Sequence, residues 1–214
     1  MPSIITHAAV PLALWCAADR GRIPAWLLAA GVVAAMLPDA DVLAFALHIP
    51  YADAFGHRGA SHSLLFASVM AALAAVLAFF GSGRPGSAQH GPGSRRPGSA
   101  VSCQPRVAPT TARPTVASTV QAAVFVFICA ASHPLLDAMT SGGLGVALAW
   151  PWSEQRFFAP WRPIRVSPFA PQFFSARGLA TLLSELRWVW LPLAGAVVAW
   201  KLIQPAPASP RDLS

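Results

Sequence analysis

Charged residues are scarce in this chain. Only 11% of its 214 residues are Asp, Glu, Lys or Arg, and just 8 are acidic, whereas a soluble domain usually carries about 25% charged residues. Hydrophobic residues make up 55%, and the mean hydropathy is +0.53. The composition therefore predicts an integral membrane protein and argues against an ordinary soluble domain.

Cysteine pairs and common catalytic motifs are also lacking. The three cysteines, Cys16, Cys103 and Cys129, form no CxxC pair, so we expect neither a disulfide framework nor a cysteine-ligated zinc site. The absence of GxSxG, Walker and GxGxxG motifs argues against serine catalysis and nucleotide binding. The sequence pI is near 11, which could suggest a nucleic-acid-binding protein. The arginines, however, lie neither along one face of a predicted helix nor on a strand interleaved with aromatic residues, so we expect no nucleic-acid partner.

Five apolar segments organise the chain. They span residues 3–18, 24–37, 63–80, 119–140 and 188–203. Several are shorter than the roughly 20 residues of a perpendicular span, so their ends should lie at headgroup depth. We predict an all-α, polytopic membrane bundle of about five helices, formed by a single membrane-embedded domain over residues 1–203.

Three other stretches differ in composition from the apolar segments. Residues 81–118 contain six Gly, six Pro, six Ser and five Arg without an acid, and such a stretch cannot bury enough apolar surface to order itself. We predict a disordered basic loop there and a disordered tail over residues 204–214. Residues 150–177 are rich in aromatic residues and arginines, which suits a loop at the membrane interface.

The distribution of charge predicts the orientation of the bundle. If all five segments cross the membrane, residues 19–22, the loop 81–118 and the C-terminus share one side. That side has nine Lys and Arg residues, against six on the other, and the positive-inside rule makes it cytoplasmic. The His and Asp residues with metal-ligand chemistry all fall at the opposite end, which we expect to be the periplasmic rim of an inner membrane.

An HxxxD pattern, His133 and Asp137, lies near the end of the fourth segment. Residues i and i+4 share a helix face, so the imidazole and the carboxylate can hold one ion. Pro134 between them removes a backbone hydrogen bond and permits a kink. The alternative is a helix-end histidine at that kink, with Asp137 as a cap.

Three further candidates lie in the first segment or just after the second. Asp39 and Asp41 follow Pro38, and in a turn or extended stretch both carboxylates can reach one point. The alternative for both is a turn or cap at the end of the segment. His7 stands alone in the first segment, where a single histidine is more often an interfacial residue than a ligand.

Two histidines five residues apart, His57 and His62, open the third segment. Gly59 between them lets the backbone bend, and the neighbouring serines can cap the helix. Arg58 can hold an anionic substrate oxygen or pair with Asp53.

Taken in order, these motifs resemble those of the LexA-regulated, membrane-bound, metal-dependent hydrolase family, which is distantly similar to zinc-dependent phospholipase C and single-strand nucleases. The resemblance covers residues 3 to about 168 and rests on His7, Leu37-Pro38-Asp39-Ala40-Asp41, His57-Arg58-Gly59-Ala60-Ser61-His62-Ser63, Ser132-His133-Pro134-Leu135-Leu136-Asp137 and Trp150-Pro151-Trp152-Ser153. It implies a hydrolase-like helical domain interrupted by the loop 81–118. The ligands it implies are His7, Asp41, His62, His133 and Asp137, with Asp39 and His57 next in rank.

We therefore expect a membrane-bound metal-dependent hydrolase with one or two divalent ions. Imidazole and carboxylate ligands suit zinc best, with manganese or iron as alternatives. A bound ion activates water for attack on an ester, with Asp39 or His57 as base or orienting group. At headgroup depth we expect membrane lipid as the partner and a lipid phosphoester as the substrate, with Arg58 and Arg162 offsetting its phosphate charge.

Two other hypotheses stay open. In the first, the site is structural or transports a metal and catalyses nothing, and four protein ligands then close it. In the second, the polar residues are ordinary helix caps and no metal binds.

Overall fold

The computed structural model describes residues 1–19, 21–81, 115–168 and 172–204. Over these residues the chain is all-helical and has no β-strand, which confirms the predicted fold class. Two isolated backbone bridges join Thr140 to Ile164 and Val146 to Phe157. The elements follow in the order η1 (Ile4–Ala8), α1 (Ala9–Ala17), α2 (Ala25–Met36), η2 (Leu37–Val42), α3 (Leu43–Ala46), η3 (Ala60–His62), α4 (Leu64–Gly81), α5 (Val116–Ala138), η4 (Gln172–Phe174), α6 (Ala176–Glu185), the π-helical turn η5 (Leu186–Trp190) and α7 (Leu191–Ile203).

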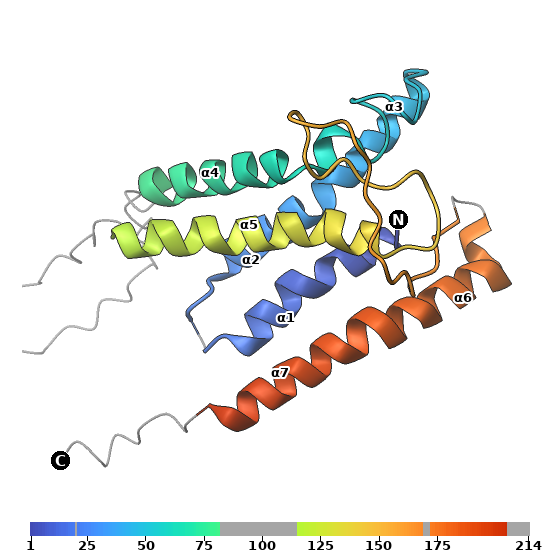
Figure 1. Cartoon of the computed structure of the whole chain (residues 1–214). Coiled ribbons are helices and arrows are strands. Elements are labelled where there is room, and N and C mark those ends of the chain that lie inside the picture. Colours follow the sequence, from blue (N-terminus) through green and yellow to red (C-terminus); the bar gives the residue numbers. More distant parts are fainter. Residues whose placement is uncertain (20, 82–114, 169–171, 205–214) are drawn as a thin grey trace, which may run out of the picture.

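These elements combine into the five predicted apolar segments (Figure 1). In the described part of the chain, three continuous helices are long and apolar enough to cross a membrane: Ala25–Ala46, Val116–Ala138 and Ala176–Ile203. Two shorter apolar helices, Ile4–Ala17 and Leu64–Phe80, accompany them.

The boundaries of three segments differ from the prediction. The second helix does not end at residue 37 but continues through η2 and α3, because Pro38 occupies the first turn of η2, where its missing N–H would have no helical partner. The fifth begins at Ala176 instead of 188, and α6 buries a single stripe formed by Gly178, Thr181 and Glu185. Residues 116–118, expected in the loop, belong to α5, whose first turn is capped by Thr115. The rest of the loop prediction, residues 82–114, and the tail 205–214 lie outside the described residues.

Helices α4 and α5 pack side by side in antiparallel directions, with α2 against α5 (Figure 1). The face of α4 buried in this pair consists of small residues at helical spacing, Ala67, Ala71, Ala74 and Ala78, which let two helices approach closely. His62 precedes α4 and Asp137 ends α5, so the antiparallel arrangement brings both to one end of the pair. Gly81 and Val116 lie at the other end, about 27 Å away for an 18-residue helix.

The first residues of the chain are tied to the last long helix through Glu185. Its carboxylate, 1% exposed, accepts hydrogen bonds from the Ser3 N–H and hydroxyl and from the Thr6 hydroxyl. The Trp190 indole donates to Thr6 as well. A buried carboxylate with this many donors is satisfied without an ion pair, and the network fixes η1, which carries His7, against α6.

The contact between α2 and α5 yields a testable prediction. A Cβ atom at Gly31 would lie 2.5 Å from Cε1 of the buried Phe125 ring, whereas a Cβ at Gly195 of α7 would meet no atom within 4 Å. We expect Gly31→Ala to lower the midpoint of thermal unfolding in detergent, at a cost of about 1–3 kcal/mol for overpacking. Gly195→Ala is the matched control and should be neutral or slightly stabilising. Equal midpoints for the two variants would contradict this packing.

Candidate metal centre

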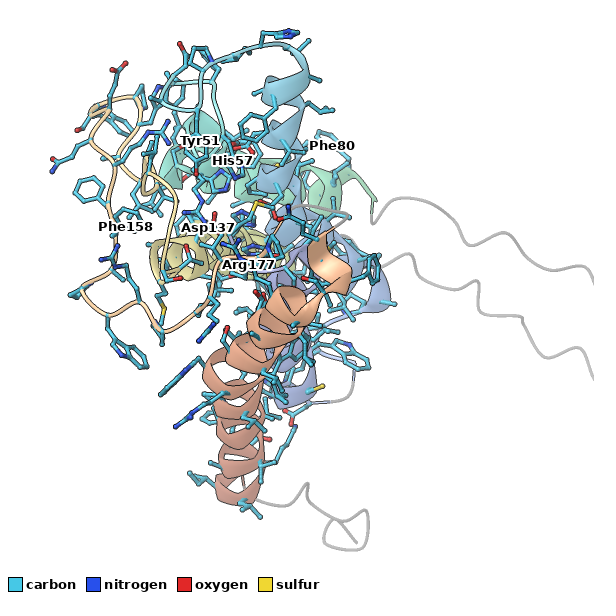
Figure 2. All side chains as sticks on the ribbon, turned by 90° about the vertical axis from the view of Figure 1, so that its right-hand side faces the viewer. Tyr51, His57, Phe80, Asp137, Phe158 and Arg177 are labelled. Atoms are coloured by element: carbon cyan, nitrogen blue, oxygen red, sulfur yellow. The ribbon has the colours of Figure 1, made fainter. Side chains whose placement is uncertain are left out.

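Four elements meet at the end of the bundle where α5 finishes. His7 comes from η1, Asp39 and Asp41 come from η2, and His62 ends η3. His133 and Asp137 lie on one face of the last turns of α5, as their spacing predicts. Figure 2 looks onto this end of the bundle, with Tyr51, His57 and Asp137 labelled near its centre.

Four of these residues form a compact group, the His/Asp cluster: Asp39, His62, His133 and Asp137. One ligand atom from each lies within 4.8 Å of the other three, and all four residues are at most 3% exposed. The closest atom pairs are His62 Nε2 to His133 Nε2 at 2.9 Å, His62 Nε2 to Asp137 Oδ2 at 3.3 Å and His133 Nε2 to Asp39 Oδ1 at 3.5 Å. Ligand atoms about 2.0–2.1 Å from a tetrahedral ion lie about 3.3 Å from one another, so the cluster has the size of a metal site.

The outer hydrogen bonds of the two histidines turn their inner nitrogens toward each other. His133 Nδ1 lies 2.7 Å from the Ala35 carbonyl oxygen, so it donates its proton there. His62 Nδ1 lies 3.1 Å from Asp41 Oδ2 and likewise has an acceptor. Both Nε2 atoms then face inward, toward each other, as they do in metal-binding imidazoles.

The direction of the pKa shift of His62 indicates that this site favours positive charge. Burial disfavours the imidazolium, yet the hydrogen bonds to Asp137 and Asp41 outweigh it and raise the pKa of His62 to about 9. Positive charge at the centre is therefore favourable, and either a shared proton or a cation can supply it.

His7 lies next to the His/Asp cluster and contacts His133, Asp39 and Asp137. Its ring stacks on His133 with centroids 3.7 Å apart. Its Nε2 lies 3.6 Å from Asp39 Oδ2 and 3.7 Å from Asp137 Oδ1, which are the oxygens that point away from the His62–His133 pair. Both His7 nitrogens, both Asp39 oxygens and Asp137 Oδ1 are buried without a hydrogen-bond partner, whereas Asp137 Oδ2 faces Arg58 Nε at 2.9 Å. Orphaned atoms of this kind are costly unless an ion satisfies them.

Asp41 lies one layer outside the cluster. Its Oδ1 is 2.5 Å from His57 Nδ1, and its Oδ2 accepts hydrogen bonds from the Arg58 N–H and the Ser61 hydroxyl. The reason that Asp39 and Asp41 separate is local: at three residues per turn, side chains two apart in a 3-10 helix point in different directions. Had the stretch been extended, as the sequence analysis considered, both carboxylates would have faced one side.

Arg58 is fully buried and pairs with Asp137, not with Asp53. Its Nε lies 2.9 Å from Asp137 Oδ2, and its two terminal nitrogens donate to Gly142 O and Thr140 Oγ1. Its backbone has a positive φ of 63°. The side chain therefore binds groups of the protein itself and holds the Asp137 carboxylate in place.

Two residues that support the site, Arg156 and Gly143, were not predicted from the sequence. Arg156, in the aromatic stretch, donates to the carbonyls of Tyr51, Asp53 and His57 and so holds the loop before His62. Gly143, with φ of +92°, leaves the room for Arg58, since a Cβ there would lie 2.6 Å from Nη1. Arg156 and Gly143 act across about 100 residues of sequence, and no local motif marks them.

A mainly apolar cavity of about 400 Å³ reaches the outer layer of the site. Asp41 and Ser61 line it, together with apolar residues that include Leu37, Phe55 and Phe66. Since Asp41 also contacts His57 and His62, a ligand in this cavity would lie beside the outer layer of the site.

Comparison with known proteins places the chain among inner membrane proteins. The profile of the YdjM inner membrane protein family matches residues 1–208. The chain is 40% identical over 193 residues to the inner membrane protein YbcI of Escherichia coli (strain K12). The aligned region covers 90% of this chain and 92% of that protein. No solved structure matches the chain.

The pairing of Arg58 with Asp137 can be tested by stability. Arg58→Gln leaves the Asp137 carboxylate buried and uncompensated, so we expect a loss of about 3–5 kcal/mol in the free energy of unfolding. Arg22→Gln is the control, because it removes an exposed pair with Asp19 and should cost at most about 1 kcal/mol. Unfolding of the detergent-solubilised protein in chelator measures both. Similar losses would contradict the assignment, and Asp137→Asn should partly rescue Arg58→Gln.

Proposed function

This chain belongs to the YdjM inner membrane protein family, and we propose that it is a membrane-bound metal-dependent hydrolase acting on a lipid phosphoester. One observation carries the proposal: two imidazole nitrogens and two carboxylates converge, buried and with unsatisfied atoms, at one end of a membrane bundle.

Charge and donor type favour a divalent cation. Three carboxylates, Asp39, Asp41 and Asp137, meet at the site, and Arg58 is the one guanidinium that ion-pairs with them among the described residues. With neutral imidazoles the group carries a net negative charge that a divalent cation offsets. Mixed imidazole and carboxylate ligands suit zinc, with manganese or iron as alternatives.

The ligand set we propose is the His/Asp cluster, with Asp39 in place of Asp41. His7 and the outward oxygens of Asp39 and Asp137 form an adjoining set of donors, which would be available to a second ion. Asp41 becomes the group that orients His62, a carboxylate–histidine arrangement that raises ligand basicity.

The chemistry we assign to the site is hydrolysis. A bound ion would supply Lewis acidity, which lowers the pKa of water toward about 7 and polarises an ester oxygen. Asp41 holds a proton on His57 Nδ1, which leaves the other ring nitrogen free to accept a proton from water. Arg58 keeps Asp137 ionised and in position. The apolar cavity beside Asp41 suits the acyl part of a lipid ester, and the resemblance to metal-dependent hydrolases supports the same class.

The rival function is a structural or transport metal site, and one observation favours it. The four cluster residues are almost completely buried, whereas a catalytic site keeps an open coordination position. The cavity that reaches Asp41 is the argument for the hydrolase.

Metal content tests the centre itself. We expect the detergent-purified protein to carry about one or two equivalents of zinc, manganese or iron. The variants His133→Ala and Asp137→Ala should lose most of this metal, because each removes a side chain that we propose binds the ion directly. Asp39→Asn should lose more metal than Asp41→Asn. His48→Ala, an exposed histidine away from the cluster, is the matched control. Wild-type protein with no more metal than His133→Ala would refute the centre.

Turnover then separates the hydrolase from its rival. The same preparations should hydrolyse a panel of lipid phosphoesters with a rate that falls on adding chelator and returns with the metal, and His57→Ala should lower the rate while keeping the metal. Metal-loaded protein without chelator-sensitive turnover on any member of the panel would favour the structural site.

The orientation in the membrane is part of the proposal. The cluster and the ends Gly81 and Val116 lie at opposite ends of α4 and α5, and the excess of Lys and Arg predicts that the loop 81–118 is cytoplasmic. A reporter inserted in this loop should be active in the cytoplasm. A periplasmic signal would reverse the topology and place the cluster on the cytoplasmic side.

A further inference from the structure

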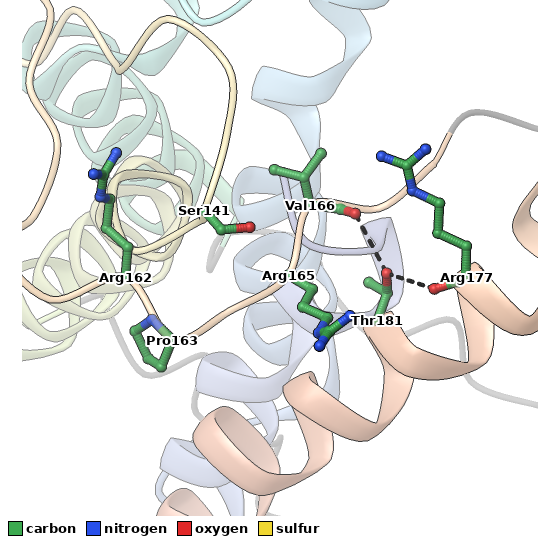
Figure 3. A pocket seen from close by; sticks show the side chains of 7 residues that line it. All are labelled: Ser141, Arg162, Pro163, Arg165, Val166, Arg177 and Thr181. Carbon is green, nitrogen blue, oxygen red and sulfur yellow. Dashed lines mark hydrogen bonds between the residues drawn. The ribbon is translucent and has the colours of Figure 1, made fainter.

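A second site lies close to the centre, on its α6 side. It is a pocket of about 420 Å³ formed by the segment after α5 and the first turns of α6 (Figure 3). Its lining residues are Ser141, Arg162, Pro163, Arg165, Val166, Arg177 and Thr181. We propose that this arginine pocket binds the phosphate group of a membrane phospholipid.

The charge of the pocket is the first argument. Its lining contains three arginines and no acid, and within the described residues none of the three forms an ion pair. The Arg165 and Arg177 bonds to serine hydroxyls use only backbone N–H groups, and Arg162 lies over the Phe158 ring with Cζ 4.7 Å from its centroid. All three side chains are exposed.

The other arginines near this end of the bundle behave differently. Arg58 is committed to Asp137, Thr140 and Gly142, and Arg156 to backbone carbonyls. The guanidinium groups of the pocket keep their donors for a ligand. A planar guanidinium matches phosphate oxygens in pairs, so phosphate is the ligand chemistry that the lining recognises.

The surroundings of the pocket point to a lipid as the source of the phosphate. A mainly apolar cavity of about 360 Å³ lies beside the same stretch of chain, since Val166 lines the arginine pocket and its neighbour Ser167 lines this cavity. Its other lining residues are Met1, Pro2, Ser3, Ile4, Ile5, Pro168, Phe173 and Phe174. Phe174 is 92% exposed and Ile5 60%. A cationic pocket that adjoins an exposed apolar surface, at the end of the apolar helix Ala176–Ile203, fits a molecule with a phosphate head and an acyl chain.

The inference does not depend on the metal centre, because none of the pocket residues belongs to the His/Asp cluster. The two sites are nevertheless joined through one short segment: Ser141 lines the pocket, and its neighbours Thr140 and Gly142 bind Arg58. The pocket therefore adjoins the segment that binds Arg58, the partner of Asp137.

The experiment measures binding of short-chain phosphatidic acid to the full-length protein in detergent. Chelator is present throughout, so that failure here is distinct from failure of the metal centre. We expect the double variant Arg165→Gln/Arg177→Gln to bind roughly tenfold more weakly, because each substitution removes a charge-assisted hydrogen bond between a guanidinium and the phosphate. The control Arg22→Gln/Arg187→Gln removes the same net charge elsewhere and should change the affinity less than about twofold. Unfolding midpoints check that all variants are folded.

Comparison ligands identify the source of the phosphate. Diacylglycerol with the same chains should show no difference between wild type and the pocket variant. Inorganic phosphate that binds as tightly as phosphatidic acid would overturn the lipid assignment and leave a free-anion site. Equal affinity of phosphatidic acid for wild type and the pocket variant, or equal losses in both double variants, would overturn the pocket as a phosphate site.

Discussion

The burial of the Asp137 carboxylate at the end of α5 is the constraint on which the arrangement of this end of the bundle depends. A fully buried anion is costly unless charge and donors surround it. Arg58 supplies a guanidinium and His62 an imidazole, and both come from the segment between α3 and α4. That segment must therefore fold back over the end of α5, held there by Arg156 and given room by Gly143.

The helix bundle brings these loops to the end of α5, which itself contributes His133 and Asp137 to the cluster. The close pairing of α4 and α5 through small residues ensures that the start of one helix and the end of the other coincide. Glu185 performs a similar task for the first turn of the chain, since it fixes Ser3 and Thr6 and thereby the position of His7. Apolar packing sets the frame, and a few buried polar networks decide where the ligand-type side chains stand within it.

The two proposed sites at this end of the bundle differ in charge. The His/Asp cluster is short of positive charge, and the arginine pocket has positive charge without internal partners. A phospholipid phosphate and a divalent cation are complementary to these two environments. The aromatic and arginine-rich stretch, which the sequence analysis assigned to the membrane interface, contributes Arg162 and Arg165 to the pocket and Arg156 to the support of the cluster.

The sequence by itself determined the helical class, the five apolar segments and the coming together of the His and Asp residues. Apolar periodicity, the i, i+4 spacing of His133 and Asp137 and the alternation of segments across a membrane are all local or additive properties. It could not decide which of Asp39 and Asp41 lies in the His/Asp cluster, because that depends on the 3-10 helix over residues 37–42 and on where His62 and His133 meet it. Nor could it assign Arg58 to Asp137 over Asp53, since that pairing joins residues nearly 80 positions apart. Tertiary structure decided these points, because burial and distance between remote segments set which charge meets which.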